Sequence, residues 1–304
     1  LAGTPVPTPD RERPGSREQP LKKPGKSAAA DGLTATTRHR KIVFNNGGIG
    51  AEIQPEAGVM THRRAAAIVA VLAGLFSGCA ADPAAKLAAV RSGQLRQARA
   101  SWWTFDPEDA TACLQNAIDS GVSKLTVDNV GTDWVVGPIE VPSNIEIVFA
   151  DGVVLRAKKG AFQGKSDVLL NITGRSNVIV RGEGTVRCVM NKADYQDPSL
   201  YSRAEHRHTV RIYNSQNVRV KNLALESSGG DGVYVGSGGT NAGAENVILE
   251  DLDCLNHHRQ GISVTGAKNL LMKNCRFNNT SGTAPQCGID YEPNYARFSV
   301  VNCV

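Results

Sequence analysis

Side chains that can do acid–base chemistry recur in the second half of the chain, each near the start of a short apolar segment. These segments start at Val210, Val233, Ile262 and Ile289. The acids and imidazoles that lie within a few residues of these starts are His206, His208, Asp231, His257, His258, Asp290 and Glu292. If the segments stack as neighbouring strands, these groups gather on one face, where they could cleave a sugar polymer or abstract a proton.

The alternation of side chains along a strand predicts which of these groups meet. Alignment of the four starts gives one outward column, made of Arg211, Tyr234, Ser263 and Asp290. Asp231 lies one step before its strand, beside His208 of the rung below and Gln260 of the rung above. Glu292 shares the face of Asp290. At ~4.8 Å per rung, Asp231 and Asp290 are roughly 9–10 Å apart, close to the ~6.5–9.5 Å between the acids of inverting glycosidases.

Hydrolysis, elimination and epimerisation all remain open on these residues. In hydrolysis, one of Asp231 and Asp290 is the general acid and the other is the base, with Glu292 assisting. Elimination or C5-epimerisation of a uronate needs a base and a partner for the sugar carboxylate. The candidates for those two roles are His257, His258, Tyr234, Arg211 and Arg259. We expect no metal or cofactor for hydrolysis, whereas calcium on Asp231 or Glu292 would favour a lyase.

The same residues also have structural interpretations. Asp231 lies in a Gly-Asp-Gly turn, Asp290 and Glu292 could form a solvated acidic turn, and at most one of the adjacent His257 and His258 is expected to face the groove. Other side chains of the strip are expected to bind substrate. They are His206, His208, Arg211, Tyr234, Arg259, Gln260 and Tyr291, with Tyr195 and Tyr201 of the insertion 189–207 walling the groove.

A repeat supplies the elements that would position this strip. Five β-rich segments begin at Asn144, Asn177, Asn217, Asn246 and Asn269, at intervals of 33, 40, 29 and 23 residues. Apolar residues keep fixed distances from these asparagines, and the same step from Arg297 puts Cys303 in the column of Cys275. Such units cannot bury their apolar sides alone and must stack on their neighbours. The pattern predicts an all-β parallel β-helix, with the asparagines as turn residues.

One helix is predicted ahead of the repeats. Asp106 can cap it, Pro107 suits its first turn, and Gly121 can end it. Its apolar face consists of Ala110, Cys113, Leu114, Ala117 and Ile118. We expect this helix to cap the open N-terminal end of the coil.

The helix, segment 138–144 and Gly182-Glu-Gly184 resemble the opening of pectin-lyase-like right-handed parallel β-helix proteins, and the resemblance covers about residues 104–304. It implies that fold and an action on polysaccharides, because the superfamily includes hydrolases, lyases, epimerases and viral tailspikes. The polygalacturonase motifs Asn-Thr-Asp, Asp-Asp and Arg-Ile-Lys are not found. Segment 288–293 resembles the Asp-Pro-His motif of alginate epimerases, without its histidine. A glycan-binding or adhesin-like β-helix is the non-enzymatic alternative.

The N-terminal part has the layout of an exported protein. Met60 is followed by Arg63, Arg64 and an apolar run at 65–76, which predicts a signal peptide over 60–78. The end of this run resembles a bacterial lipobox, with Cys79 as the lipidated residue. Residues 1–59 are expected to be a non-native or disordered extension, 79–103 a linker, and 104–304 a β-helix domain that is incomplete at its C-terminus.

Charge and cysteine content narrow the partners. The net charge of +5 arises before Cys79, because the rest of the chain holds 23 basic and 23 acidic residues. A neutral body with no basic stripe excludes nucleic acid as the main partner. The seven cysteines include no Cys-x-x-Cys pair, so they are expected to be buried small residues rather than zinc ligands. We expect a monomer that is secreted or held at the cell envelope by a lipid anchor, with a polysaccharide as its substrate.

Overall fold

The structure is a computed structural model that describes residues 82–238, 243–293 and 299–304. The expected extension (1–59), the signal segment (60–78) and Cys79 lie outside the described residues. No helix within the described ranges is long and apolar enough to cross a membrane.

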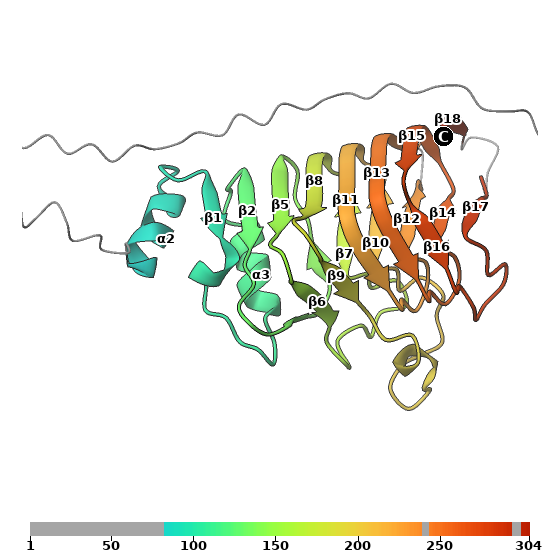
Figure 1. The fold of residues 1–304 in the computed structure, drawn as a ribbon, viewed down its shortest axis with the longest axis horizontal. Coiled ribbons are helices and arrows are strands. Elements are labelled where there is room, and N and C mark those ends of the chain that lie inside the picture. The colour runs from blue at the N-terminus through green and yellow to red at the C-terminus, as the bar shows by residue number, and fades with distance from the viewer. Residues whose placement is uncertain (1–81, 239–242, 294–298) are drawn as a thin grey trace, which may run out of the picture. The chain divides into compact units, whose positions relative to one another are not determined.

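Sheet A, a twelve-stranded parallel sheet, forms the longer wall of a coil in which each turn lies on the one before (Figure 1). Its main path is β1 (Gln97–Arg99), β2 (Lys124–Val127), β5 (Ile145–Phe149), β8 (Ser176–Gly182), β11 (Gln216–Glu226), β13 (Ala244–Leu255), β15 (Ala267–Lys273) and β18 (Val300–Cys303). Its side branch is β3 (Trp134–Val136), β6 (Val154–Ala157), β9 (Arg187–Val189) and β16 (Arg276–Asn278). The successive pairings are parallel, as stacked turns of a coil require.

Sheet B, a six-stranded parallel sheet, forms the opposite wall and carries the candidate site. Its order is β4 (Ile139–Glu140), β7 (Leu170–Thr173), β10 (Val210–Tyr213), β12 (Val233–Gly236), β14 (Ile262–Val264) and β17 (Ile289–Tyr291). The register pairs Leu170 with Val210, then Val233, Ile262 and Ile289 in turn. Alignment on the last four residues of this column, predicted from sequence, is therefore confirmed, as is the all-β parallel β-helix.

A ladder of asparagines marks one corner of each turn, as expected for turn residues. The asparagines of this ladder all adopt the left-handed conformation, with φ between 52° and 62°; they are Asn144, Asn177, Asn217, Asn246, Asn269 and Asn302. From Asn177 onward, each side-chain amide donates to the amide oxygen of the asparagine one rung before it, at 2.8–3.1 Å. Asparagine tolerates this conformation better than other residues with a side chain, so the repeated residue fixes the corner.

The last repeat begins at a different residue from the one predicted. Leu270 pairs with Cys303, so Asn302 and not Arg297 is the counterpart of Asn269. Cys303 is therefore not in the column of Cys275, and that prediction was wrong. The pattern of apolar residues near the C-terminus fits both alignments, and only the asparagine ladder separates them.

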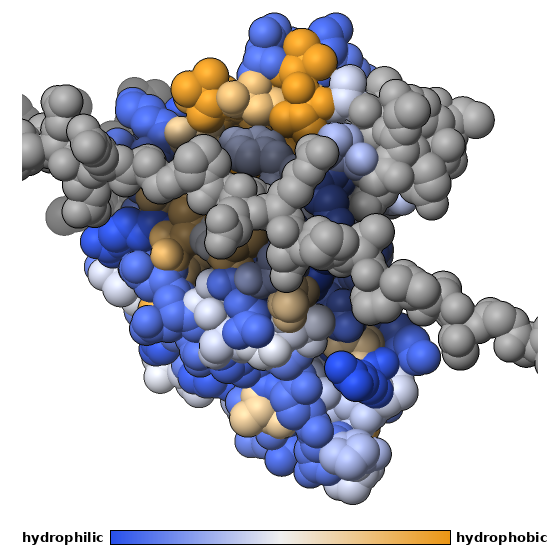
Figure 2. All heavy atoms as spheres, turned by 90° about the vertical axis from the view of Figure 1, so that its right-hand side faces the viewer, coloured by the Kyte–Doolittle hydropathy of each residue, from blue (hydrophilic) through white to orange (hydrophobic). Residues whose placement is uncertain are grey.

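The end of the coil beyond β16 and β18 leaves part of the core open. Phe277 and Cys303 are only half-buried, although they continue columns that are closed in earlier turns. Figure 2 views the molecule from this side and shows apolar side chains gathered at one edge. The large apolar residues exposed in this region include Leu271, Val301 and Val304.

Two helices precede the regular turns. The segment 79–103, expected to be a linker, contains regular elements from residue 83 onward: α2 (Pro83–Arg91), β1 and the 3-10 turn η1 (Ala100–Trp102). β1 pairs with β2, so the coil begins within this segment. α3 (Thr111–Ile118) buries the predicted apolar face. The predicted cap was wrong: Asp106 accepts from the N–H of Glu108, and Asp109 accepts from the N–H of Thr111 instead.

α3 closes the first edge of sheet B. The Gln115 side chain donates to the carbonyl oxygen of Glu140 and accepts from its N–H, both at 2.9 Å. The Thr111 hydroxyl accepts from the N–H of Gly137 at 2.7 Å. This helix therefore takes the place of a preceding turn of the coil, as predicted for a cap.

The six cysteines in the described part of the chain are free thiols. Cys188 and Cys254 are fully buried among core side chains, where burial raises the pKa of each thiol. Cys113, Cys188 and Cys254 are therefore small buried core residues, as the sequence predicted, whereas Cys275, Cys287 and Cys303 are only partly buried, contrary to that prediction.

Candidate active site

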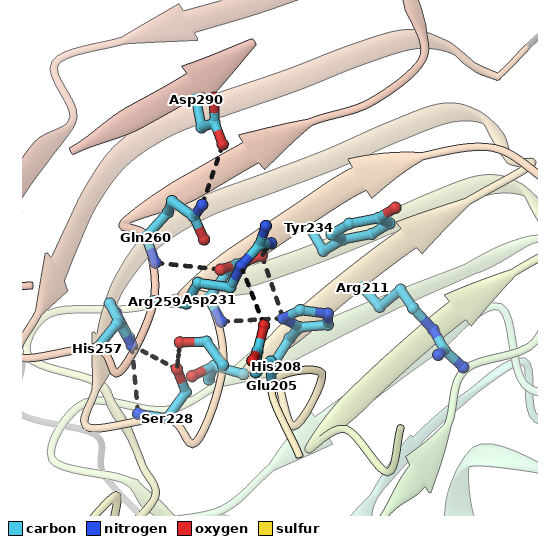
Figure 3. A network of polar contacts seen from close by, with 12 residues as sticks. Glu205, His208, Arg211, Ser228, Asp231, Tyr234, His257, Arg259, Gln260 and Asp290 are labelled. Carbon is cyan, nitrogen blue, oxygen red and sulfur yellow. Dashed lines mark hydrogen bonds and ion pairs between the residues drawn. The ribbon is translucent and has the colours of Figure 1, made fainter. Parts of the chain in front are cut away.

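The segments that lead into β10, β12, β14 and β17 converge at one face of sheet B (Figure 3). The strand register places Arg211, Tyr234, Ser263 and Asp290 on four successive rungs, one above another. This is the column predicted from the sequence. The residues just before each strand form a second, deeper row, which contains most of the hydrogen bonds of the site.

Asp231 lies at the centre of this deeper row and its side chain is completely buried. Its backbone N–H donates to His208 Nδ1 at 2.9 Å, and its Oδ1 accepts from the N–H of Gln260 at 3.1 Å. Both contacts cross to the neighbouring rungs that the alignment predicted. The flanking glycines are required, because a Cβ at Gly232 would lie 2.5 Å from His257 Nε2. The tight Gly-Asp-Gly turn thus holds a carboxyl group inside the coil.

The contact between Asp231 and His208 bears on where each group carries its proton. His208 Nδ1 accepts a backbone hydrogen bond, so its proton is on Nε2, and burial holds its pKa well below the usual range. Asp231 Oδ2 lies 3.4 Å from this same Nδ1 and forms no direct hydrogen bond in the described structure, although the Ser263 side chain is close to the carboxyl group. A carboxylate would repel the nitrogen lone pair, whereas a protonated oxygen can donate to it. Burial raises the Asp231 pKa to about 7, in agreement with this geometry.

Gln260 joins Asp231 to the second carboxyl group. Besides its backbone bond to Asp231, it donates from Nε2 to Asp290 Oδ2 at 3.0 Å. Gln260 is fully buried, while Asp290 is only partly buried. The two aspartates therefore share one rigid connector but face different environments.

Arg259 is the cation of the site. Its Nη1 lies 3.8 Å from Asp231 Oδ2, its Nη2 3.7 Å from Glu292 Oε2, and its Nε 3.9 Å from Glu205 Oε2. These three acids belong to different turns of the coil. Glu292 is half-exposed, at 52 %, so the ion pairs run from the buried Asp231 out to the surface.

Aromatic rings border the site on the side of β10 and β12. The rings of Tyr234 and His208 stack at 4.9 Å with an interplanar angle of 16°, and His206 lies 5.8 Å from His208. The Tyr234 hydroxyl bonds to Thr265 at 2.9 Å, and burial raises the pKa of this phenol. Arg211 points away from Asp231, towards Asn171, whose Oδ1 lies 3.0 Å from Arg211 Nε (Figure 3).

The adjacent histidines do not face the groove as catalytic groups would. His257 is fully buried, its Nδ1 lies 2.9 Å from the Ser228 hydroxyl, and burial lowers its pKa to about 3. His258 is also buried and bonds to Thr283 at 3.0 Å. The structure therefore favours the structural interpretation for His257, because its hydrogen bonds serve the turn at Ser228.

Tyr195 and Tyr201 are not exposed beside the candidate site, contrary to the prediction that they wall a groove there. Both are buried, with exposed fractions of 4 % and 3 %. Their rings pack around the buried guanidinium of Arg207 at 5.5 and 5.2 Å, and the Tyr201 hydroxyl accepts from the N–H of Gly160. The insertion turns its aromatics inward because they shield this arginine. Tyr291, by contrast, is exposed at the end of β17.

Three contributors were missed from the sequence. Glu205 pairs with Arg259, Ser228 orients His257, and Tyr213 lies 6.3 Å from Tyr234. Tyr213 follows Arg211 by two residues on the same outward face, so the alternation that located Arg211 could have found it. Ser228 has no comparable signal, because it lies in an irregular turn.

The described residues hold no group of three or more carboxylate, imidazole or thiol side chains arranged as metal ligands. Asp231 is instead surrounded by a histidine, an arginine and backbone N–H groups. Calcium on Asp231 or Glu292 stays a prediction.

Comparison with known proteins identifies the coil. The sequence model of the family described as "Right handed beta helix region" matches residues 171–304. Among curated proteins, the SPbeta prophage-derived uncharacterized protein YorA of Bacillus subtilis is 24% identical over 169 residues, which cover 51% of this chain. The chain spans only 28% of the length of that relative.

Two solved structures are similar to the chain at low sequence identity. A candidate glycosyl hydrolase of Parabacteroides merdae superposes with a TM-score of 0.50 at 16% identity, over 69% of this chain and 97% of that one. A tailspike protein of the Acinetobacter baumannii bacteriophage Fri1, a capsular polysaccharide depolymerase, superposes at 0.46 with 15% identity, over 68% and 37%. The parallel register of both sheets, the family match and the first of these superpositions agree: the chain is a right-handed parallel β-helix protein.

Proposed function

We propose that this protein hydrolyses glycosidic bonds of a polysaccharide, with Asp231 as general acid and Asp290 as the base that activates water. The observation that carries the proposal is the unequal pair of carboxyl groups on one connector, Gln260. One of them is buried with its pKa raised to about 7, so it still holds a proton near neutral pH. The name of the Parabacteroides merdae protein, a candidate glycosyl hydrolase, makes sugar polymers the first substrates to test.

The spacing of the pair suits inversion. Asp231 and Asp290 belong to segments two rungs apart, which at ~4.8 Å per rung is roughly 9–10 Å between backbones. In an inverting glycosidase, a protonated acid donates to the leaving oxygen while a carboxylate on the opposite side takes a proton from water. Glu292 assists by pairing with Arg259 beside the acid.

The candidate bases for elimination are less suited to accept a proton from the substrate. A phenol or imidazole base must be accessible and must lose or accept a proton near neutral pH. Burial raises the Tyr234 pKa, and His257 is inside the coil. His208 already uses Nδ1 to hold Asp231. These contacts support hydrolysis over elimination or epimerisation, the alternatives drawn from the sequence.

The proposal places the enzyme outside the cytoplasm, held by a lipid anchor. Its basis is the signal-like segment 60–78 and the lipobox-like residues before Cys79. Fractionation of bacteria that express the chain checks both parts. A Cys79→Ser variant should move from the membrane to the soluble envelope fraction, and equal membrane retention of the two proteins would contradict lipidation.

The decisive assay incubates the protein with acidic and neutral polysaccharides and records reducing ends and the ultraviolet absorbance of unsaturated sugars. Hydrolysis gives reducing ends alone. Asp231→Asn and Asp290→Asn should each lower the rate by ~10²–10⁴-fold, because each removes one proton transfer. Asp133→Asn, which removes a partly exposed acid beside β3, is the control and should keep full activity. Unsaturated products, or an active Asp231→Asn variant, would refute the assignment.

A further inference from the structure

Arg259 is loosely held for an arginine surrounded by acids. Each of its three ion pairs is 3.7–3.9 Å long, beyond hydrogen-bond length. Its Nε is buried and forms no hydrogen bond in the described structure. Arg187 shows the alternative, because it makes two hydrogen bonds of 2.7 Å to Glu226. The Arg259 guanidinium therefore gives up no direct hydrogen bond to these acids when it moves.

The backbone around Arg259 is fixed, so only the side chain can move. The N–H of Arg259 donates to the carbonyl oxygen of Gly230 at 3.0 Å, and the next N–H, of Gln260, donates to Asp231. A Cβ at the following residue, Gly261, would lie 2.6 Å from the carbonyl oxygen of Gly288. Any displacement is thus a rotation of a long side chain about a rigid turn.

The Arg259 side chain lies next to the buried Asp231 and is itself partly exposed to solvent. Asp231 is completely buried, whereas the Arg259 side chain, whose Nη1 contacts Asp231 Oδ2, is 15 % exposed. On its other side the guanidinium reaches Glu292, which is 52 % exposed. Figure 3 shows the guanidinium beside the Asp231 carboxyl group. A general acid must touch the glycosidic oxygen, so this guanidinium has to move before Asp231 can act.

We propose that Arg259 is a displaceable cover of Asp231, which an anionic group of the bound ligand draws towards the surface and so exposes the acid. This inference rests on the proposed function for its purpose, but the movement itself does not depend on catalysis. Arg259 is a positioning residue in this scheme. The ligand group would replace Glu205 and Glu292 as partner of the guanidinium and form the close, charge-assisted hydrogen bonds that these acids lack.

Displacement also changes the balance of charge at the acid. The charged and titratable groups that face Asp231 include Arg259, Asp290, His208, Tyr234 and the Cys287 thiol. Arg259 is the one cation among them, because His208 is neutral. It favours the ionised form of Asp231 while it covers the carboxyl group, and its departure strengthens the hold of Asp231 on its proton. The acid is therefore best protonated when a ligand is bound.

Carboxyl labelling measures the cover directly. The protein is treated with a carbodiimide and an amine at about pH 5, below the Asp231 pKa of about 7, so that the acid is protonated throughout. Peptide mass spectrometry then gives the labelling of Asp231. Inorganic sulfate is the anionic probe, and chloride at matched ionic strength controls for screening.

Wild-type Asp231 should label slowly in chloride and faster in sulfate. Arg259→Ala should raise labelling in chloride by about tenfold or more, if the uncovered state is under ~10% populated in the wild type, and sulfate should add nothing further. Arg259→Met, which keeps part of the stem, should lie between them and serves if the alanine variant does not fold. Arg187→Ala, on the opposite sheet, should match the wild type.

Equal labelling in wild type and Arg259→Ala would overturn the cover, and a wild type indifferent to sulfate would overturn its displacement by anions. Failure of the proposed function looks different. In that case Asp231 responds to Arg259 and to sulfate as stated, while no polysaccharide is cleaved.

Discussion

Replacement of Asp231 by asparagine should stabilise the protein at alkaline pH while it abolishes activity. The amide has the shape of the protonated acid: its oxygen can accept from the N–H of Gln260, and its NH₂ can donate to His208 Nδ1. The variant therefore keeps the contacts of the neutral form and cannot ionise. The wild type must bury a negative charge once the pH exceeds the Asp231 pKa.

The size of the effect follows from the two pKa values. Asp231 titrates at about 7 in the folded protein and at 3.8 when unfolded. Between these values the folded state holds a proton that the unfolded chain has lost, so wild-type stability falls as the pH rises. At about 1.4 kcal/mol per pH unit, the loss reaches ~4 kcal/mol above pH 7 and is absent below pH 4.

Urea unfolding of both proteins at about pH 4 and about pH 8 tests this reasoning. The free energies of unfolding should agree within ~1 kcal/mol at the lower pH, and the asparagine variant should exceed the wild type by ~4 kcal/mol at the higher pH. Asp133→Asn is the control and should show no gain at alkaline pH. A pH-independent difference, or an Asp231→Asn variant that is less stable at pH 8, would refute the buried neutral acid.

Three further predictions concern the scaffold. Asp109→Asn should lower the free energy of unfolding by about 1 kcal/mol near neutral pH, and by less as the pH falls towards 2. The reason is that Lys158 and Thr111 hold the Asp109 pKa at about 2, on a side chain that is 41 % exposed. Thermal unfolding across this pH range measures the difference. Asn217→Ala should lower the free energy of unfolding by about 2 kcal/mol, through the left-handed turn and two ladder bonds, and Asn217→Gly by about half as much. Tyr201→Phe should cost about 1–2 kcal/mol, because a backbone N–H loses its acceptor. The KM of Tyr201→Phe should equal that of the wild type, whereas a raised KM would indicate that Tyr201 contacts the substrate.

The fold could be predicted because its signals are local and repeated. Each turn carries an asparagine at the same position and the same alternation of apolar residues. A misaligned turn would therefore disagree with the turns on either side of it. The prediction failed where the repeat is unsupported by neighbours, at Arg297 and Asn302. It also failed at the start of α3, where Asp106 and Asp109 both have the sequence of a helix cap.

The sequence predicted which residues of the candidate site lie side by side on neighbouring strands, but not how deeply their side chains are buried. Strand pairing confirmed the column from Arg211 to Asp290, because alternation in a strand decides which residues share a face. Exposure depends instead on what the connecting segments cover. The sequence does not indicate that Arg207 is buried, and hence that Tyr195 and Tyr201 turn inward. Nor does it indicate that the Arg259 guanidinium approaches the buried Asp231 carboxyl group.

The amide of Gln115 has a consequence for association between molecules. The first strand of a parallel sheet is normally a template on which another chain can add. Here the N–H and carbonyl of Glu140 are already bonded to a side chain of the same molecule. An incoming strand would have to displace the Gln115 side chain, which belongs to the same molecule and is therefore present at high effective concentration. α3 thus protects this edge of sheet B against intermolecular β-sheet growth, so the coil resists fibre formation from that side.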